Sequence, residues 1–314
     1  MSTDVQSVQT SELPSVTAAR SNRNVALDLL RIVSALGVVW FHCKGPGKFL
    51  AYAGLPALIA LSLGLATAPG ASAPFSLMVV KRAKRLLLPW LFWCAVYGGA
   101  NLIKSQGLKE ISRHPANEWA FLAGTSLHLW YLPFAFLVTC LARPLQAYIY
   151  YSERTAGATA VMLVSGTTAI CAWILETTTF PAPFGQWVFG FPAVAVGLSL
   201  PHSGGLSRKT LRVVSLVLAV SIGCLATHSP AFYIPCILGT AAIGAAWLVH
   251  IPALGCISWL AGLSFGIYLV HPFVQFLTCR LTPLHEGGLL AILVILISIA
   301  VTDGLKRTPL RHFM

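Results

Sequence analysis

Apolar residues follow one another along most of the chain in long runs, and only short polar stretches separate these runs. A helix that spans a membrane needs about 20 largely apolar residues, within a range of about 17 to 25. Ten runs meet this length, at residues 26–43, 50–68, 86–103, 120–142, 156–175, 184–200, 211–227, 231–249, 254–278 and 287–305. The pattern therefore predicts an all-α polytopic membrane protein with about ten transmembrane helices.

The chain ahead of Asn24 has a different composition. Residues 1–23 are polar and rich in Ser, Thr, Val and Gln, and they lack the apolar core of a secretory signal peptide. We expect residues 1–23 to be a disordered cytoplasmic tail and residues 24–314 to be one transmembrane domain.

Composition excludes a soluble enzyme, because only 10% of the residues are charged and 56% are hydrophobic, whereas a water-soluble domain has about 25% charged residues. The 21 Lys and Arg residues outnumber the 9 Asp and Glu residues, which gives a formal net charge of +12. Cytoplasmic loops carry the excess of Lys and Arg. With the N-terminus inside, fourteen basic residues fall on the cytoplasmic side and six on the other. We therefore expect both termini to be cytoplasmic. We also expect the basic residues to interact with membrane lipid and not with nucleic acid.

The eight cysteines are scattered singly through apolar runs, without the paired spacing that binds zinc. We expect them to be small core residues and we expect no metal site.

The first apolar run holds three ionisable residues, Asp28, Arg31 and His42. Such groups cost several kcal/mol at membrane depth unless they are paired or face a wet cavity. Asp28 and Arg31 are three residues apart and can pair on one helical face. Arg31 and His42 are eleven residues apart, which is almost a whole number of turns and a rise of about 16 Å. The alternative is an interfacial anchor formed by Asp28 and Arg31, with His42 in the outer headgroup layer.

Four cations lie within five residues at 81–85, directly before a Leu-rich run that contains Pro89. Arg82 and Arg85 belong to this basic cluster, and guanidinium groups bind phosphate in a bidentate manner. The cluster therefore predicts a site for a phosphorylated ligand on the cytoplasmic side. Membrane topology alone would also place basic residues there.

Two further stretches combine histidine with aromatic residues. His128 and Trp130 open the fourth run on the outer side, and Tyr268 and His271 lie within the ninth run, beside Pro272. Trp and Tyr at a helix end commonly form the interfacial belt, so Trp130 needs no functional role. A proline in a membrane helix frees a backbone carbonyl, so His271 is either a structural residue or a member of a site.

Taken together, these stretches resemble the membrane-bound acyltransferase 3 family, from about Asn24 to the end of the chain. The family's first helix carries Leu-Asp-x-Leu-Arg, and the same Arg is followed by ten residues and a His. Its second signature is a basic residue, two others and an Arg before a Leu-rich segment with Pro. The corresponding stretches here are residues 27–31, the pair Arg31 and His42, and residues 82–89, with His-Leu-Trp-Tyr-Leu at 128–132 and Tyr-Leu-x-His-Pro at 268–272. The run after Pro56 departs from the Phe-rich second helix of the family.

The resemblance implies a membrane O-acyltransferase in the bacterial inner membrane. Acyl-coenzyme A is the implied cytoplasmic co-substrate, with its phosphates held by Arg31, Arg82 and Arg85, and no cofactor is bound permanently. His42 is the implied catalytic residue, as general base or covalent acyl carrier. The supporting residues are Asp28, which holds Arg31, and His128, Trp130, Tyr268 and His271.

The implied acceptor is a carbohydrate or a lipid-linked sugar of a surface or exported polysaccharide, with polysaccharide synthesis or export proteins as further partners. A multi-pass transporter or proton-coupled permease is the alternative class, in which Asp28, Arg31, His42 and His271 line a conduction path. A purely structural membrane protein is the third.

Overall fold

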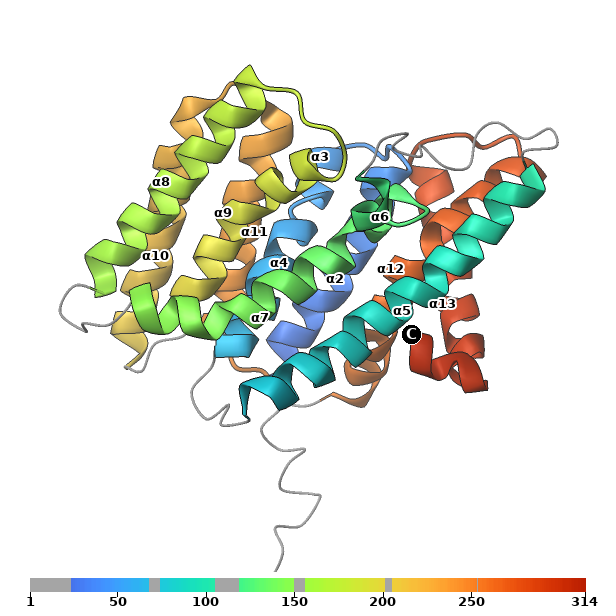
Figure 1. Ribbon diagram of the computed structural model, residues 1–314, viewed down its shortest axis with the longest axis horizontal. Coiled ribbons are helices and arrows are strands. Elements are labelled where there is room, and N and C mark those ends of the chain that lie inside the picture. The colour runs from blue at the N-terminus through green and yellow to red at the C-terminus, as the bar shows by residue number, and fades with distance from the viewer. Residues whose placement is uncertain (1–23, 68–73, 105–118, 150–155, 201–204, 253) are drawn as a thin grey trace, which may run out of the picture.

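The computed structural model describes residues 24–67, 74–104, 119–149, 156–200, 205–252 and 254–314, and all regular structure in these ranges is helical (Figure 1). The predicted tail at 1–23 lies outside the described residues. The long helices are α2 (Val25–His42), α4 (Gly54–Thr67), α5 (Phe75–Lys104), α7 (Tyr131–Ile149), α8 (Ala156–Thr177), α9 (Phe184–Ser199), α10 (Leu206–Gly223), α11 (Pro230–Leu248), α12 (Gly255–Leu281) and α13 (Gly288–Lys306). The short helical elements are α3 (Lys48–Ala51), α6 (Ala120–Ala123), η1 (Leu127–Trp130), η2 (Cys224–Ala226) and η3 (Pro309–Phe313).

Each of the ten predicted apolar runs overlaps one long helix, and the all-helical polytopic fold is confirmed. By length and composition, seven spans of the described chain are long and apolar enough to cross a membrane. They are α2, α3 together with α4, α8, α10 together with η2, α11, α12 and α13, and α9 is a shorter apolar helix. The total of ten spans and the cytoplasmic placement of both termini stay predictions.

Helix α5 begins earlier than the sequence predicts. The predicted start at residue 86 is wrong, because the helix already begins at Phe75 and includes the whole basic cluster. Lys, Arg, Leu and Met are good helix formers, and Lys81 and Arg85 keep exposed side chains. The helix also continues through Pro89, although a proline offers no N–H to the carbonyl four residues earlier.

The run predicted as one helix at 120–142 is interrupted. It contains α6, the 3₁₀ turn η1 and the first part of α7. Gly124 adopts a φ of 80° between α6 and η1, a conformation that glycine adopts without steric cost. A Cβ on Gly124 would come within 2.6 Å of Cys94 Sγ. The chain therefore turns tightly against α5 and carries His128 and Trp130 into the protein on η1, instead of opening a helix at the outer side.

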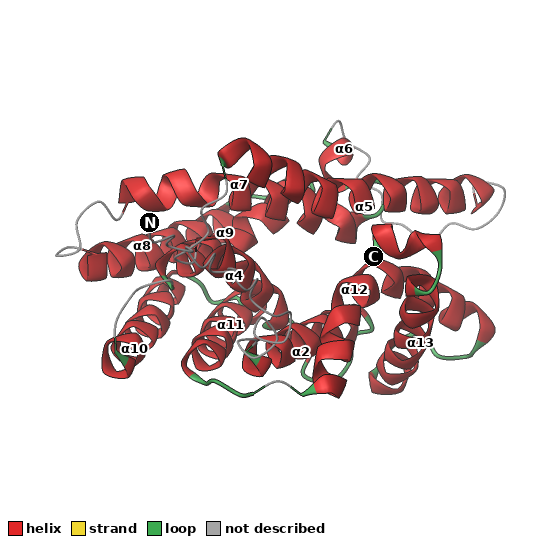
Figure 2. Cartoon of the chain, turned by 90° about the horizontal axis from the view of Figure 1, so that it is seen from below, coloured by secondary structure: helices red, strands yellow, loops and turns green. Residues whose placement is uncertain are grey.

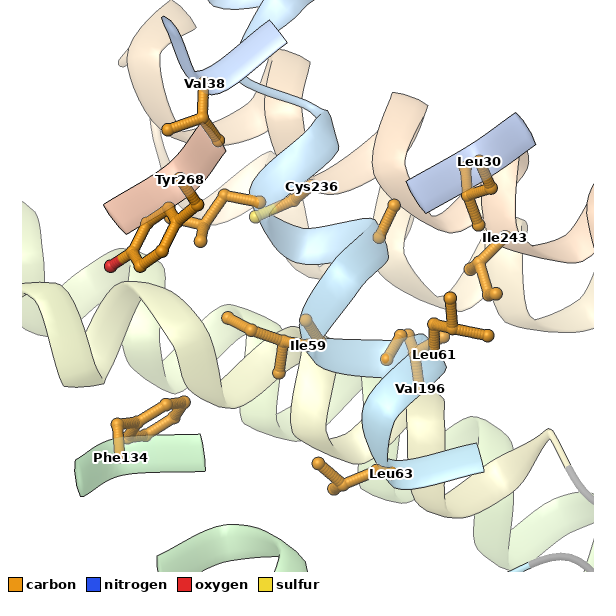
Figure 3. Packing of buried hydrophobic residues seen from close by; sticks show 14 of the residues in the cluster. Leu30, Val38, Ile59, Leu61, Leu63, Phe134, Val196, Cys236, Ile243 and Tyr268 are labelled. Carbon is orange, nitrogen blue, oxygen red and sulfur yellow. The ribbon is translucent and has the colours of Figure 1, made fainter. Parts of the chain in front are cut away.

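Helix α4 lies at the centre of the bundle and contacts α2, α7, α9 and α11. Figure 3 shows Ile59, Leu61 and Leu63 along α4 among side chains of neighbouring helices such as Phe134 and Val196. Lipid tails are as apolar as leucine, so close packing, not water exclusion, holds such helices together. Glycines of α9 and α11 allow the approach, because a Cβ on Gly197 or Gly239 would lie 2.7 Å from a backbone oxygen of the α3–α4 region. The helix that departs from the family pattern is thus a well-packed central element.

Figure 2 shows α5 and α7 along one side of the molecule, opposite α2, α4 and α12. Helix α12 contacts both α2 and α13, and α7 contacts α5 and α4. This arrangement brings together the segments that carry the predicted functional residues.

Candidate functional site

A cavity of about 640 Å³ lies between α2, α4, α5, α7 and α12. We call it the donor cavity, after the role proposed for it below. Among the residues that the structure describes, five that line it are basic, and none of the described lining residues is Asp or Glu. The basic residues are Arg31, Lys81, Arg82, Arg85 and Arg143. Like charges around one space repel each other in the absence of an anion, so the donor cavity is suited to a negatively charged ligand.

Arg31 reaches the cavity from α2, and its neighbour Asp28 fixes it there. Arg31 Nη1 donates to Asp28 Oδ1 over 3.0 Å, with the Asp28 side chain 2% exposed and the Arg31 side chain 33% exposed. The predicted pairing of these residues is confirmed. A buried carboxylate needs such a charged partner, so the pair holds the guanidinium at the wall while leaving part of it accessible.

The remaining cations come from α5 and α7. Arg85 lies four residues after Lys81 and three after Arg82, so it neighbours both on one face of α5. All three residues line the cavity. Arg82 is half-buried and Arg85 is exposed. Arg143 belongs to α7 and lines the same space. Three helices therefore contribute guanidinium groups to one cavity.

Another wall of the donor cavity is apolar. Leu55, Leu58, Leu61 and Leu65 of α4 contribute to it, and Phe265 of α12 joins them. The donor cavity therefore combines a cationic part, suited to phosphates, with an apolar part, suited to an extended organic arm.

Tyr268 connects the donor cavity with the buried histidines. Its side chain lines the cavity, is 7% exposed, and lies 5.6 Å from the Tyr131 ring between centroids. The Tyr268 hydroxyl donates to the backbone oxygen of His128, and the Tyr268 backbone oxygen lies 2.8 Å from His271 Nδ1. Tyr268 therefore links α12 to η1 and lies at the edge of the cavity, with its ring near those of His128 and His271.

Three histidines, His42, His128 and His271, form what we call the histidine cluster. The ring centroids of His42 and His271 are 5.2 Å apart, and those of His128 and His271 are 5.6 Å apart. His271 is fully buried, His128 is 7% exposed, and His42 is exposed at the end of α2. His128 Nδ1 lies 2.8 Å from Ser126 Oγ. The fold thus presents one accessible imidazole in contact with a buried one.

The structure brings the predicted residues into two adjoining groups. Arg31, Arg82, Arg85 and Tyr268 line the donor cavity. His42 is not among the lining residues, so the cavity does not join Arg31 to His42 directly, and Tyr268 with His271 lies between them.

Trp130 belongs to neither group. It is 5% exposed and packs against Phe134, with ring centroids 5.6 Å apart. Trp130 is therefore a core residue and not part of an interfacial belt.

Sequence reasoning missed three residues of this region. Arg143 was expected in a polar gap after residue 142, but α7 extends to Ile149 and carries it along the cavity. Tyr131 was given no functional role from the sequence, and it lines the cavity. Tyr97 had no distinguishing neighbour in the sequence, yet its ring lies 5.0 Å from that of His128 and its hydroxyl donates to Leu269 O over 2.8 Å.

Within the described residues, no three His, Cys, Asp or Glu side chains are arranged to hold a metal ion. The eight cysteines are free thiols.

A comparison with protein families matches residues 24–306 to the acyltransferase 3 model, described as an acyltransferase domain. No curated protein and no solved structure matches the chain. The family match covers most of the sequence and includes the whole histidine cluster. It also includes every described residue of the donor cavity except Met314. This multi-pass membrane protein therefore belongs to the acyltransferase 3 family and is a membrane acyltransferase.

Proposed function

We propose that the protein transfers an acetyl or similarly short acyl group from cytoplasmic acyl-coenzyme A to a sugar hydroxyl of a surface or exported polysaccharide. The reaction is an O-acyl transfer in the bacterial inner membrane. Membership of the acyltransferase family supports the transfer chemistry. The single observation that carries the choice of donor is a cation-lined cavity with no Asp or Glu among its described lining residues, which adjoins a histidine cluster through one tyrosine.

Coenzyme A matches this arrangement chemically. Its phosphates suit Arg82 and Arg85, because charge-assisted and bidentate bonds to phosphate are the strong ones. Arg31, held by Asp28, and the additional cations Lys81 and Arg143 extend the same binding surface. The flexible thioester arm then runs along the apolar wall toward Tyr268.

His42 is the proposed catalytic residue. It removes the proton from an acceptor hydroxyl while the hydroxyl oxygen attacks the thioester carbon, and general-base assistance of this kind contributes about 10²- to 10⁴-fold. The C–S bond breaks, and the leaving sulfur takes the proton from the His42 imidazolium. In the alternative role, His42 carries the acyl group covalently before the acceptor attacks.

The exposure of His42 suits a polar acceptor that approaches from the opposite side to the donor. A cytoplasmic donor side is consistent with Figure 1, in which α2 and α5 begin and α13 ends toward the same edge of the molecule. The basic cluster of α5 and Lys306 of α13 lie near these ends, as expected for a cytoplasmic face. A lipid-linked sugar and polysaccharide synthesis or export proteins are the partners consistent with this topology.

Turnover of radiolabelled acetyl-coenzyme A by purified protein in detergent, with a carbohydrate acceptor, tests the proposal. We expect transfer of label to the acceptor and release of one thiol per ester formed. Sealed vesicles that move a solute without consuming thioester would instead support the permease, and an acyl donor without phosphates that is used equally well would overturn the choice of coenzyme A.

A further inference from the structure

We propose that His271 is the positioning residue for His42: Nε2 of His271 accepts a hydrogen bond from the ring N–H of His42 and thereby determines which His42 nitrogen serves as the base. This inference rests on the proposed function for its catalytic meaning. The hydrogen bond itself is inferred from the geometry of α12, η1 and the end of α2, whatever reaction the site performs.

The first step is a missing backbone bond in α12. In an α-helix, the carbonyl of each residue accepts the N–H of the residue four positions later. The partner for Tyr268 O would be residue 272, which is proline and has no N–H. A carbonyl freed in this way inside a membrane helix needs another donor.

His271 supplies that donor. Its Nδ1 lies 2.8 Å from Tyr268 O. A carbonyl oxygen only accepts, so Nδ1 must carry a hydrogen, and the neutral ring then leaves Nε2 as an acceptor without a hydrogen. The order Tyr268, His271, Pro272 therefore selects one tautomer of a fully buried imidazole.

The second step concerns the other ring nitrogen of His271, Nε2. The atom is buried and has no hydrogen-bond partner among the described residues. Burying an unpaired polar atom is costly, so an acceptor in this state indicates a donor that arrives in the working enzyme.

The nearest imidazole is that of His42, with ring centroids 5.2 Å apart and ring planes inclined by 37°. The terminal torsion of a histidine side chain has a broad distribution, so the exposed His42 ring can turn its N–H toward His271. His128 is the competing donor, with ring centroids 5.6 Å apart, but its Nδ1 lies 2.8 Å from Ser126 Oγ, which fixes the ring, and in that position its Nε2 makes no hydrogen bond with a described residue either.

The consequence for the reaction is a defined base. With one His42 nitrogen donating to His271, the other nitrogen has its lone pair free for the acceptor hydroxyl, as in sites where a third group orients the base. The proton moves from the acceptor hydroxyl to this nitrogen and then to the leaving sulfur. His271 stays neutral throughout and only accepts.

Two substitutions of His271 separate this role from packing. In His271→Asn the side-chain amide can still donate to Tyr268 O, but no acceptor reaches His42. In His271→Gln the longer amide places an acceptor near the former Nε2. We expect kcat to fall roughly 100-fold in His271→Asn, the lower end of a general-base contribution, with KM for acetyl-coenzyme A unchanged. We expect His271→Gln to recover much of the loss, and His228→Asn, at an exposed histidine between η2 and α11, to behave as wild type.

A third variant changes no polar side chain. Pro272→Ala restores an N–H that competes for Tyr268 O, and it removes a residue that is unfavourable in a helix interior. We expect this variant to be at least as heat-stable as the wild type and yet to lose kcat several-fold. Wild-type kcat in both Pro272→Ala and His271→Asn would overturn the proposal, as would equal losses in His271→Asn and His271→Gln.

A readout independent of turnover distinguishes this proposal from the proposed function. In detergent-solubilised protein with ¹⁵N-labelled histidine, we expect a coupling across the hydrogen bond between the His42 and His271 nitrogens, absent in His271→Asn. A detected coupling with no thioester turnover would refute the acyl-coenzyme A function and leave the hydrogen bond standing. Absence of the coupling in an active wild-type enzyme would refute the positioning role alone. If His271→Asn fails to fold, Pro272→Ala decides the question. Loss of the coupling in this variant supports the proposal, and retention of the coupling overturns it.

Discussion

Two regions of the molecule, the helices α8 and α10 and the surroundings of α12, satisfy their buried polar groups in different ways. In α8 and α10, at the left of Figure 1, hydroxyl groups donate to carbonyls of their own helix four residues earlier. Ser165, Thr168 and Ser221 do so over 2.7 to 2.9 Å.

Around α12, the hydroxyls of Thr278 and Ser264 also donate within their own helix, but tyrosine and histidine side chains bond between elements or keep a buried nitrogen unpaired among the described residues. Tyr97 and Tyr268 donate to backbone oxygens of other elements, whereas Nε2 of His128 and Nε2 of His271 have no partner in the described chain. Local back-bonding is the ordinary solution for a hydroxyl in a helix. The comparison shows that the α8 and α10 end, which we call the packing end, satisfies these hydroxyl groups within its own helices. The α12 region instead leaves acceptor atoms for groups that a substrate or a moving side chain supplies.

The largest expected effect tests this contrast directly. His42→Ala should lower kcat for acyl transfer by roughly 10²- to 10⁴-fold, because it removes the proposed base. Ser221→Ala, which removes a hydroxyl of the packing end, should leave kcat unchanged. Steady-state rates with labelled acetyl-coenzyme A measure both, and equal rates in the two variants would mean that the histidine cluster is structural.

The next effect concerns the cationic wall. Replacing Arg82 and Arg85 together by Gln should weaken coenzyme A binding by more than about 2 kcal/mol, since each charge-assisted bond contributes about 1.5 to 3 kcal/mol. Isothermal titration of detergent-solubilised protein measures this loss.

The matched control for the cationic wall is the double substitution of Arg208 and Lys209 by Gln, at the exposed start of α10. Unchanged binding in the Arg82 and Arg85 variant, together with reduced membrane insertion, would assign the basic cluster to topology.

A smaller effect is expected from crowding the packing end. A Cβ on Gly223 would meet Thr168 Cβ at 2.5 Å and Ser165 O at 2.7 Å, whereas a Cβ on Gly166 would meet nothing within 4 Å. Gly223→Ala should therefore destabilise the protein by about 1 to 3 kcal/mol through overpacking, and Gly166→Ala should not. Thermal unfolding in detergent measures the difference, and kcat of the folded enzyme should be the same in both. A kcat that falls with Gly223→Ala would couple the two regions.

The smallest effect is at the loop that follows His42. Lys44 Nζ lies 2.7 Å from Glu286 Oε2, and both side chains are exposed. The hydrogen bond from Lys44 and its charge lower the pKa of the Glu286 carboxyl. A lowered folded pKa stabilises the folded state above the unfolded value of about 4.3, and this contribution is lost as the pH falls through the folded value.

The Tm of the wild type should therefore exceed that of Lys44→Gln slightly at neutral pH, and the difference should vanish in acid. Lys209→Gln provides the control at an exposed lysine far from this loop. A difference that persists below the folded pKa would show that Lys44 acts through packing and not through its charge.

Local patterns predicted much of the fold. The apolar runs located the long helices, because a membrane helix must be continuously apolar over its own length. The pairing of Asp28 with Arg31 also followed from helical spacing alone. These features depend on neighbours within one or two helical turns.

Other features depended on contacts between distant segments. The early start of α5 and the tight turn at Gly124 were not predicted, because neither interrupts the hydrophobic pattern clearly. Arg143 was assigned to a loop because the end of α7 could not be read from apolarity.

The sequence by itself determined the membrane class of this protein, its family and the local geometry of its charged pairs, since each rests on composition or on residues a few positions apart. Only the tertiary structure decided that His42, His128 and His271 meet, that the cations of three helices share one cavity, and that Tyr268 lies between the two groups. The physical reason is that helix spacing sets which residues share a face, whereas the packing of α2, η1 and α12 sets which faces touch.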